Sequence, residues 1–298
     1  MTTVQVGART LKLSNLDKVL YPEAGFTKAE VIHYYANVAP AMLPHLAGRA
    51  LTFRRFPDGV DGGSFFEKRC PGHRPPWVQV ALGPGDRKGG IEYCVLDEPA
   101  ALVWAANMAA LELHAPMALA EDLDAPRAVV FDLDPGAPAD IHTCCELALS
   151  IRDVLAAIGL DVWAKTSGSK GLQLYVPVNG PLTHEDAASF ALAVGQLLEK
   201  QQPKRVVTTM SKAARPGKVF VDWSQNNRHK TTVAVYSLRA RPRPTVSTPV
   251  AWEEVAASAD HSLDLVFEAP EVLDRVHHQG DLFAPVLTTV QRLPALQG

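Results

Sequence analysis

The sequence contains 298 residues, 47% of them hydrophobic, and carries a formal net charge of −3. A chain of this length can bury a large core, as one big domain or as two closely packed lobes. It has no stretch of 18 apolar residues and no charged leader followed by an apolar run, which argues against a membrane protein. We therefore expect a cytoplasmic protein with no membrane partner.

Charge is distributed unevenly along the chain. From Arg205 to Arg243 there are nine Lys or Arg residues and one acid, whereas from Glu253 to Asp281 there are eight acids and a single Arg275. This asymmetry predicts one face that binds a polyanion and an acidic tail elsewhere. Chance clustering on a solvated surface is the alternative.

The first predicted helix opens at Thr27, which forms a capping box with Glu30. Pro40 and Pro44 are expected to bend or shorten it. The apolar face of this helix carries Val31, Tyr35, Val38 and Met42. Gly-rich loops then surround the short segment "SFFEKR", and a second helix is expected over about 99–113.

The middle of the chain has a clearer order of elements. We expect strand 128–133, helix 141–158, strands 161–165 and 172–176, a helix opening at Thr183, and strand 205–210. This β-α-β-β-α-β order is the split-βαβ arrangement of ferredoxin-like and RNA-recognition folds. Two more strands, "KVFVDWS" and "TVAVYSL", are expected to extend the sheet, and the Pro-rich "ARPRPTVSTPV" to link it to a short helical tail.

We expect no disulfide framework among the cysteines Cys70, Cys94, Cys144 and Cys145. The last two fall in a helical pattern, where core packing is the expected role. Cys70 and His73 have the spacing of half a zinc site, but no second half follows, so zinc is the less favoured interpretation.

Acids interrupt two strands that otherwise read as buried. In "VVFDLDPG", Asp132 and Asp134 project from one face of the strand, away from Phe131 and Leu133. Like charges at this spacing repel, and burial adds to the cost, so the pair must share a proton or bind a cation. Asp222 in "KVFVDWS" repeats the pattern. Three such carboxylates can hold two divalent ions for phosphoryl transfer; a structural ion pair is the alternative for each acid alone.

The loop "TSGSKGLQLY" has the composition of an anion site. Gly168 and Gly171 allow close approach of the backbone, the serines donate, and Lys170 neutralises charge. It does not match the Walker A pattern, and an ordinary hairpin turn is the alternative. Further cations that could hold phosphates are Arg215, Lys218 and Arg239, whereas His114 is ambiguous alone.

Four segments, "VVFDLDPG", "TSGSKGLQLY", "KVFVDWSQN" and "YSLR", occur in an order that closely resembles the polymerase domain of bacterial DNA ligase D, of the archaeo-eukaryotic primase superfamily. "LSNLDKVLYP" and "GGSFFEK" extend the resemblance over about residues 10–245. It implies an α+β primase-polymerase fold, with a split-βαβ (RNA-recognition-like) catalytic sheet and an N-terminal α/β lobe. We expect that lobe over about 1–125, a catalytic lobe over 126–245 and a helical tail over 246–298, together forming one catalytic domain.

The resemblance also implies a function. It is that of a DNA-directed nucleotidyltransferase, a DNA-dependent DNA/RNA polymerase that adds ribonucleotides or deoxynucleotides to a primer 3′ end during DNA repair by non-homologous end joining. The implied cofactor is a pair of Mn²⁺ or Mg²⁺ ions. The implied partners are DNA with gaps, overhangs or double-strand-break ends, NTPs and dNTPs, a Ku-type protein and a DNA ligase, in a nucleoid-associated setting.

Site residues follow position by position from the resemblance. The catalytic metal ligands would be Asp132, Asp134 and Asp222. The incoming nucleotide would contact His114, Ser167, Ser169, Lys170, Gly171, Arg215 and Arg239, with Lys218 added from the charge pattern. A downstream 5′-phosphate would bind Asn15, Lys18 and Lys28. Template contacts and base stacking would involve Arg54, Arg55, Phe65 and Phe66.

Lys28 also has a local argument for binding an anion. It follows the Thr27 helix cap, and free backbone N–H groups in a first helical turn favour a phosphate. Two ordinary surface lysines, Lys18 and Lys28, are the alternative.

Two rival functions remain open. "VVFDLDPG" also resembles the haloacid-dehalogenase phosphatase motif, but Pro135-Gly136 replaces the expected turn and no later paired-Asp loop follows. A non-enzymatic single-strand nucleic-acid binder would use Phe65 and Phe66, but it leaves three inward carboxylates unexplained. The sequence contains no Lys-x-Asp-Gly ligase nucleophile motif and no nuclease segment, so a stand-alone protein and an excised domain are both open.

Overall fold

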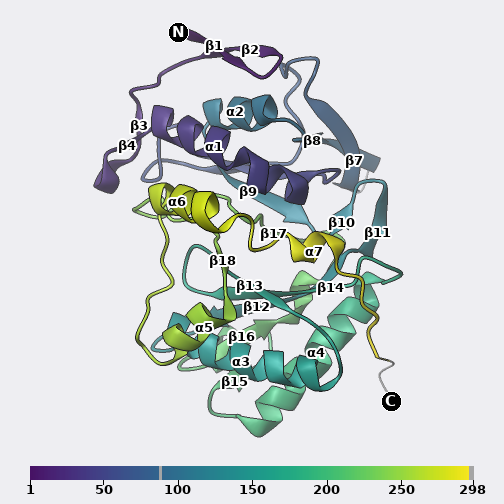
Figure 1. Cartoon of the computed structure of the whole chain (residues 1–298). Helices are drawn as coiled ribbons and strands as arrows, with labels where there is room; N and C mark the ends of the chain where they lie inside the picture. The colour runs from purple at the N-terminus through teal and green to yellow at the C-terminus, as the bar shows by residue number, and fades with distance from the viewer. Residues whose placement is uncertain (87–88, 295–298) are drawn as a thin grey trace. The chain divides into compact units, whose positions relative to one another are not determined.

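The computed structural model describes residues 1–86 and 89–294 and contains two compact units (Figure 1). The first unit comprises residues 1–123, 231–247 and 267–281. The second comprises residues 124–230, 248–266 and 282–298. The tail expected over 246–298 therefore contributes segments to both units, and the division into lobes predicted from the sequence stays a prediction.

The second unit is built on a six-stranded sheet in the order β15-β16-β12-β14-β13-β18. Its strands are β12 (Ala128–Pro135), β13 (Trp163–Thr166), β14 (Leu172–Pro177), β15 (Val206–Val207), β16 (Val219–Asp222) and β18 (Pro249–Val250). β12 is antiparallel to both of its neighbours, β14 and β16. The expected split-βαβ order is present, because β12 and β13 flank β14 and are joined by a helical crossover.

Two helices pack against the apolar face of this sheet, α3 (Ile141–Ala157) and α4 (His184–Gln201) (Figure 1). Asp140 and Thr183 cap their N-termini by accepting hydrogen bonds from backbone N–H groups three residues on. Alternation along β12 points Phe131 to the helices, where its ring meets that of Phe190 edge-on, with ring centres 6.5 Å apart. The other face of β12 is left for the aspartates.

The edge of the sheet differs from the prediction. The strand after α4, expected over 205–210, is only the two-residue β15, and β16 takes the place next to β12. "TVAVYSL" was expected to extend the same sheet, but its strand β17 (Thr231–Val233) pairs with β9 in the first unit. Short strands carry too little hydrophobic alternation to fix which sheet they join.

The first unit contains a four-stranded sheet in the order β17-β9-β5-β6. Its other strands are β5 (Thr52–Arg55), β6 (Phe65–Glu67) and β9 (Ala110–Pro116). Phe53 of β5 packs its ring against Trp104 of α2 (Pro99–Asn107), with centroids 6.4 Å apart. One face of the sheet thus rests on the helical layer of α2 and α1 (Lys28–Leu46), which pack against each other.

Two helix predictions need correction. The capping box of Thr27 and Glu30 is confirmed, but α1 continues past Pro40 and Pro44 to Leu46, so these prolines do not shorten it; the expected bend stays a prediction. α2 ends at Asn107 instead of near residue 113, because the segment after it forms strand β9. A continuous apolar run does not distinguish a buried helix from a buried strand.

The remaining elements are small. The strands are β1 (Thr2–Val6), β2 (Arg9–Leu13), β3 (Val19–Tyr21), β4 (Phe26–Thr27), β7 (Gln79–Asp86), β8 (Gly89–Val95), β10 (Ala118–Leu119) and β11 (Asp122–Pro126). The helices are α5 (Trp252–Ala259), α6 (Ala269–Gln279) and α7 (Pro285–Thr288), with three short 3₁₀ turns at Pro22–Ala24, Lys212–Ala214 and Trp223–Gln225 among the described residues. No helix in the described part of the chain is both long and apolar enough to cross a membrane.

The cysteine prediction is wrong for one pair. Cys70 and Cys94 form a disulfide in the first unit, across a sequence separation of 24 residues. The loop after β6 runs beside β8, where the Cys70 N–H donates to the Glu92 carbonyl, and this proximity is invisible in the spacing. Because Cys70 is bonded to Cys94, it offers no thiolate for the zinc site considered with His73. Cys144 and Cys145 are free and buried, as expected.

Candidate active site

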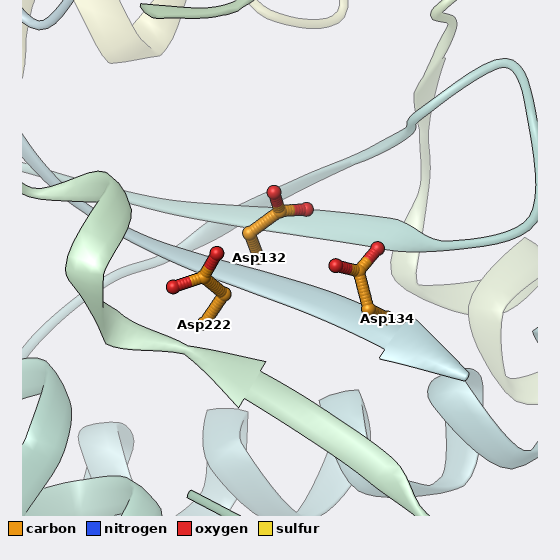
Figure 2. Close-up of side chains that lie close together, drawn as sticks. All are labelled: Asp132, Asp134 and Asp222. Atoms are coloured by element: carbon orange, nitrogen blue, oxygen red, sulfur yellow. The ribbon is translucent and has the colours of Figure 1, made fainter. Parts of the chain in front are cut away.

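Three aspartates meet on the open face of the second unit's sheet (Figure 2). Asp132 and Asp134 lie two residues apart on β12, and Asp222 lies directly opposite Asp132 on β16. One ligand oxygen from each can be chosen so that all three lie within 4.8 Å of one another. The predicted convergence of these carboxylates is therefore present.

A polar row continues from this cluster across two more strands. Gln173 of β14 is paired with Asp132, and Lys165 of β13 is paired with Gln173. Gln173 donates to Asp132 Oδ1 over 3.1 Å, and its own Oε1 accepts from Lys165 Nζ over 2.6 Å. The Lys165 side chain is buried. The row therefore holds one oxygen of Asp132 in place and sets a buried positive charge behind it.

The electrostatics of the cluster disfavour three bare charges. Burial, followed by the charges of Asp134 and Asp222, raises the pKa of Asp132 to about 7, although the hydrogen bond from Gln173 and the charge of Lys165 oppose the rise. Like charges directly opposite on neighbouring strands destabilise a sheet. The arrangement fits a site that is completed by a cation.

Asp222 is held by the turn that follows it. Its Oδ1 accepts from the backbone N–H of Ser224 at 3.1 Å and from the Ser224 hydroxyl at 2.5 Å. Its Oδ2 accepts from Gln225 at 3.2 Å. These bonds fix the carboxylate before any ligand binds.

The loop "SGSKG" between β13 and β14 is organised by Ser167. The Ser167 hydroxyl oxygen accepts from the N–H groups of Ser169 and Gly171, at 3.3 and 3.1 Å. Its hydroxyl hydrogen is then the part that can be donated to an anion. Gly168 has a left-handed φ of +65°, which glycine adopts without strain.

Gly171 is required for packing. A Cβ there would lie 2.2 Å from the carbonyl oxygen of Leu133 on β12. We expect Gly171→Ala to displace the loop, to cost about 1–3 kcal/mol of unfolding free energy and to weaken anion binding by Lys170. The measurement is chemical denaturation together with titration of a nucleoside triphosphate. Gly180→Ala is the matched control, since its Cβ would meet ordinary contact at 3.6 Å; equal effects of the two changes would contradict this role.

The turn "RPGK" flanks the other side of the end of β12. A Cβ on Gly136 would lie 2.2 Å from the Arg215 carbonyl oxygen, and the Gly136 N–H donates to the Lys218 carbonyl. The Arg215 guanidinium stacks on Phe220, 3.7 Å from its ring centre. Its Nε is buried and has no hydrogen-bond partner among the described residues. A buried donor without a partner marks a place where an acceptor can bind.

The two remaining predicted nucleotide contacts, His114 and Arg239, lie in the first unit. Both bind the same buried carboxylate, Glu112, at 2.9 Å and 3.2 Å. The structure therefore groups the predicted contacts into one set around the end of β12 and another set around Glu112.

The predicted template and stacking residues lie on the paired strands β5 and β6 of the first unit: Arg54 and Arg55 on β5, and Phe65 and Phe66 on β6. Phe65 and Phe66 are 46% and 59% exposed, as expected for stacking residues. Strand alternation separates them: Phe66 lies opposite Arg54, and Phe65 opposite Arg55. Each arginine lies over its paired ring, at 5.4 and 5.2 Å from the ring centre. The ring of Phe66 also contacts His114, with ring centres 5.7 Å apart.

The backbone argument for the predicted 5′-phosphate site is wrong. The N–H groups of Lys28 and Ala29 donate to the carbonyls of Lys18 and Leu16, so the first turn of α1 does not present free donors. The segment before the helix folds back on it, with Asn15 in a left-handed turn conformation. Its carbonyl groups accept the hydrogen bonds of these backbone N–H groups.

The side chains, however, do gather positive charge at this place. Lys28 is buried, and burial together with the charges of Lys18 and Arg55 lowers its pKa. Lys18 Nζ is paired with the exposed carboxylate of Asp58 at 2.7 Å. A cluster of cations that depress one another's protonation favours an anion.

Comparison with known proteins is decisive for the family. Residues 27–283 match the model of the LigD primase-polymerase domain. The chain belongs to this family. The LigD of Mycolicibacterium smegmatis, a multifunctional non-homologous end joining protein, is 45% identical over 279 residues, which cover 93% of this chain. The bifunctional LigD of Bacillus subtilis is 31% identical over 91% of the chain.

Comparison with solved structures supports the same family. The polymerase domain of Mycobacterium tuberculosis ligase D, solved in complex with DNA, matches with a TM-score of 0.87 and 42% identity, over 94% of this chain and 99% of that one. The chain spans only 36% of the M. smegmatis LigD and 43% of the B. subtilis LigD. It thus corresponds to the primase-polymerase part of these longer LigD proteins, and the α+β fold class is confirmed.

Sequence reasoning missed three buried polar residues of this LigD-family domain: Glu112, Lys165 and Gln173. Each interrupts an apolar strand, as the aspartates do, in "ALELHAP", "WAKT" and "LQLYVP". The same test that singled out Asp132 would have found Glu112 and Lys165, because a lone charge on a buried strand needs a partner.

Proposed function

We propose that the chain is a DNA-directed nucleotidyltransferase that adds nucleotides to a primer 3′ end. The observation that carries this proposal is the cluster of Asp132, Asp134 and Asp222 on one face of the sheet, beside two loops suited to phosphates. The similarity to the polymerase domain of ligase D in complex with DNA supports DNA as the partner.

The donor set of the cluster fits divalent ions. Three carboxylates supply oxygen ligands only, the preference of Mg²⁺ and Mn²⁺. Burial, followed by repulsion from Asp134 and Asp222, raises the pKa of Asp132, and a bound cation would offset both effects. Two ions bound there would acidify the primer hydroxyl and neutralise the triphosphate during in-line displacement. We favour Mn²⁺ from the family resemblance.

The chain's own residues then bind and orient the substrate. Lys170 and the Ser167 hydroxyl face the triphosphate from one loop, and the partnerless Nε of Arg215 donates to it from the other. Ser169, Gly171 and Lys218 shape these two loops. Gln173 keeps Asp132 aligned. His114 and Arg239 complete the nucleotide contacts, and the exposed ring of Phe66 stacks on a base, with Phe65, Arg54 and Arg55 serving the template.

Lys18 and Lys28, beside Asn15, form the receptor for a downstream 5′-phosphate. We expect Lys28→Met to abolish any preference for gapped DNA with a 5′-phosphate over the same DNA with a 5′-hydroxyl. The change should also stabilise the free protein near neutral pH, because the lowered pKa means that the folded state disfavours the charged lysine. This gain shrinks as the pH rises through the lowered pKa.

DNA binding and thermal unfolding test the Lys28 prediction, with Lys12→Met on the exposed side of β2 as the matched control. If the wild type binds both DNAs equally, the receptor assignment fails.

We place this activity in the cytoplasm, at the nucleoid, in repair of gaps and double-strand-break ends by non-homologous end joining. The relatives' names support that pathway. A Ku-type protein and a DNA ligase are the proposed partners, and NTPs and dNTPs the substrates.

The test is nucleotide addition to a gapped primer-template with Mn²⁺. We expect the primer to be extended, and extension to stop when the metal is chelated. A metal-dependent phosphatase activity on p-nitrophenyl phosphate without primer extension would favour the haloacid-dehalogenase alternative. DNA binding with neither activity would leave a single-strand binder. Asp222 opposes both alternatives, because it is a lone acid where the haloacid-dehalogenase pattern expects a later paired-Asp loop, and because a single-strand binder has no use for a third carboxylate beside Asp132 and Asp134.

A further inference from the structure

Glu112 is a buried carboxylate to which the proposed reaction assigns no role. Its side chain is 2% exposed, and it lies on β9 with cationic or polar groups on several sides. Oε1 accepts from Arg239 Nε at 3.2 Å and from the Ala240 N–H at 3.0 Å. Oε2 lies 2.9 Å from His114 Nε2 and 3.6 Å from Arg54 Nη1.

The register of the sheet explains why these groups surround the Glu112 carboxylate. Glu112 and His114 are two residues apart on β9 and so share a face. Arg54 lies opposite Glu112 on β5, and Phe66 lies opposite Arg54 on β6, which extends the same face. Arg239 reaches the carboxylate from the chain that follows β17. The three side chains that meet the carboxylate, those of His114, Arg239 and Arg54, all belong to residues that the proposed function uses, as does Phe66 beyond Arg54.

The Glu112 carboxylate also determines which ring nitrogen of His114 carries a hydrogen. Burial alone would raise the pKa of Glu112, but the hydrogen bond from His114, the charges of Arg239 and His114 and the Ala240 N–H outweigh burial and hold it at about 2. Glu112 is therefore ionised at working pH and can only accept hydrogen bonds. Nε2 of His114 must carry a hydrogen, which leaves Nδ1 as the ring nitrogen for a further partner.

We propose that Glu112 is a positioning residue for the incoming nucleotide, which acts by fixing the His114 tautomer and the direction of the Arg239 guanidinium. The inference rests on the proposed function, which assigns both residues to the nucleotide. A buried charge is costly unless it is paired and hydrogen-bonded, and Glu112 has two oxygens that each bind a different one of these residues. One carboxylate thus couples two nucleotide contacts and reaches the Arg54–Phe66 pair.

The test compares Glu112→Gln with wild type in nucleotide addition to a gapped primer-template. Glutamine keeps the shape and one acceptor but loses the charge. We expect KM for the nucleotide to rise by about tenfold or more, as loss of charge-assisted hydrogen bonds implies, with a smaller change in kcat. Glu112→Asp retains the charge on a shorter stem and should recover part of the KM. Should the glutamine variant fail to fold, the aspartate variant carries the test.

Two further readouts separate positioning from general stabilisation. In a His114→Ala, Arg239→Ala background, adding Glu112→Gln should raise KM by less than twofold more, because the groups through which it acts are gone. Glu98→Gln, which removes the Glu98 charge from an ion pair with Arg9 in the same unit, is the matched control and should leave KM unchanged. Nitrogen NMR of His114 should show the Nε2–H form in wild type and a mixture in Glu112→Gln.

The outcomes distinguish the two proposals. An unchanged KM and an unchanged His114 tautomer in Glu112→Gln would overturn the role of Glu112 while leaving nucleotidyl transfer intact. If wild type does not extend primers, the proposed function fails, and nucleotide affinity with the NMR tautomer still decides on Glu112: weaker affinity and a mixed tautomer support it, and no change in either overturns it.

Discussion

Replacing Asp132, Asp134 or Asp222 with alanine is expected to reduce nucleotide addition by more than about 100-fold in each case. Partners that merely orient metal ligands cost about 10–100-fold when removed, so loss of a direct ligand should cost more. The three carboxylates come from two neighbouring strands and converge on one point, so none can replace another. The measurement is the initial rate of primer extension with Mn²⁺ at saturating nucleotide.

Asp153→Ala is the control for this series. Asp153 is an exposed carboxylate on α3 in the same unit, and its loss should leave the rate unchanged. Circular dichroism should show that all four variants are folded. Substantial extension by all three cluster variants would mean that the carboxylates do not form the reaction centre.

Asp132→Asn is expected to stabilise the metal-free protein, and more at pH 8 than at pH 4. The pKa of Asp132 is raised from 3.8 to about 7 in the folded state, so between these values the folded protein binds more protons than the unfolded chain. Its free energy of unfolding therefore falls as the pH rises through that window. Asparagine cannot ionise and removes this loss, which is on the order of a few kcal/mol at pH 8.

Thermal unfolding in a chelator, at pH 4 and pH 8, measures this effect, and a gain of roughly 5 °C or more at pH 8 is expected. Adding Mn²⁺ at pH 8 should raise the Tm of wild type and have less effect on Asp132→Asn. Asp153→Asn should show no such dependence. A Tm difference between Asp132→Asn and wild type that does not vary with pH would contradict the buried-charge account.

Four strands of the second unit's sheet, β12, β13, β14 and β16, were predictable because they carry a strong hydrophobic pattern. The alternation in "VVFDLDPG" assigns Phe131 to the helices and Asp132 to the open face, and the structure shows this arrangement. The helix caps at Thr27 and Thr183 could be predicted for a similar reason, since each capping side chain accepts a hydrogen bond from the backbone N–H three residues on. Local interactions of this kind can be predicted because the residues that make them are only two or three positions apart in the sequence.

What could not be predicted depends on long-range packing. β17 pairs with β9 across more than 100 residues, and nothing in "TVAVYSL" specifies that partner. The Cys70–Cys94 bond depends on two segments lying side by side. The N–H groups at the start of α1 were expected to be free, yet residues 16–18 fold back and bind them.

The candidate site shows the same division. The aspartates were found from their strands alone, whereas the network of Glu112 needs the register of three strands and a contact from Arg239, 127 residues away. The sequence identified Arg239 as a cation that could hold a phosphate and His114 only through the family resemblance, and it carried no sign that one carboxylate binds both.

The most direct test of the two-metal site is anomalous diffraction from crystals grown with Mn²⁺, a non-hydrolysable nucleoside triphosphate and gapped primer-template DNA. We expect two anomalous peaks in contact with the carboxylates of Asp132, Asp134 and Asp222, with the triphosphate bound beside "SGSKG". Crystals in which the triphosphate is bound and no manganese contacts these aspartates would contradict the account.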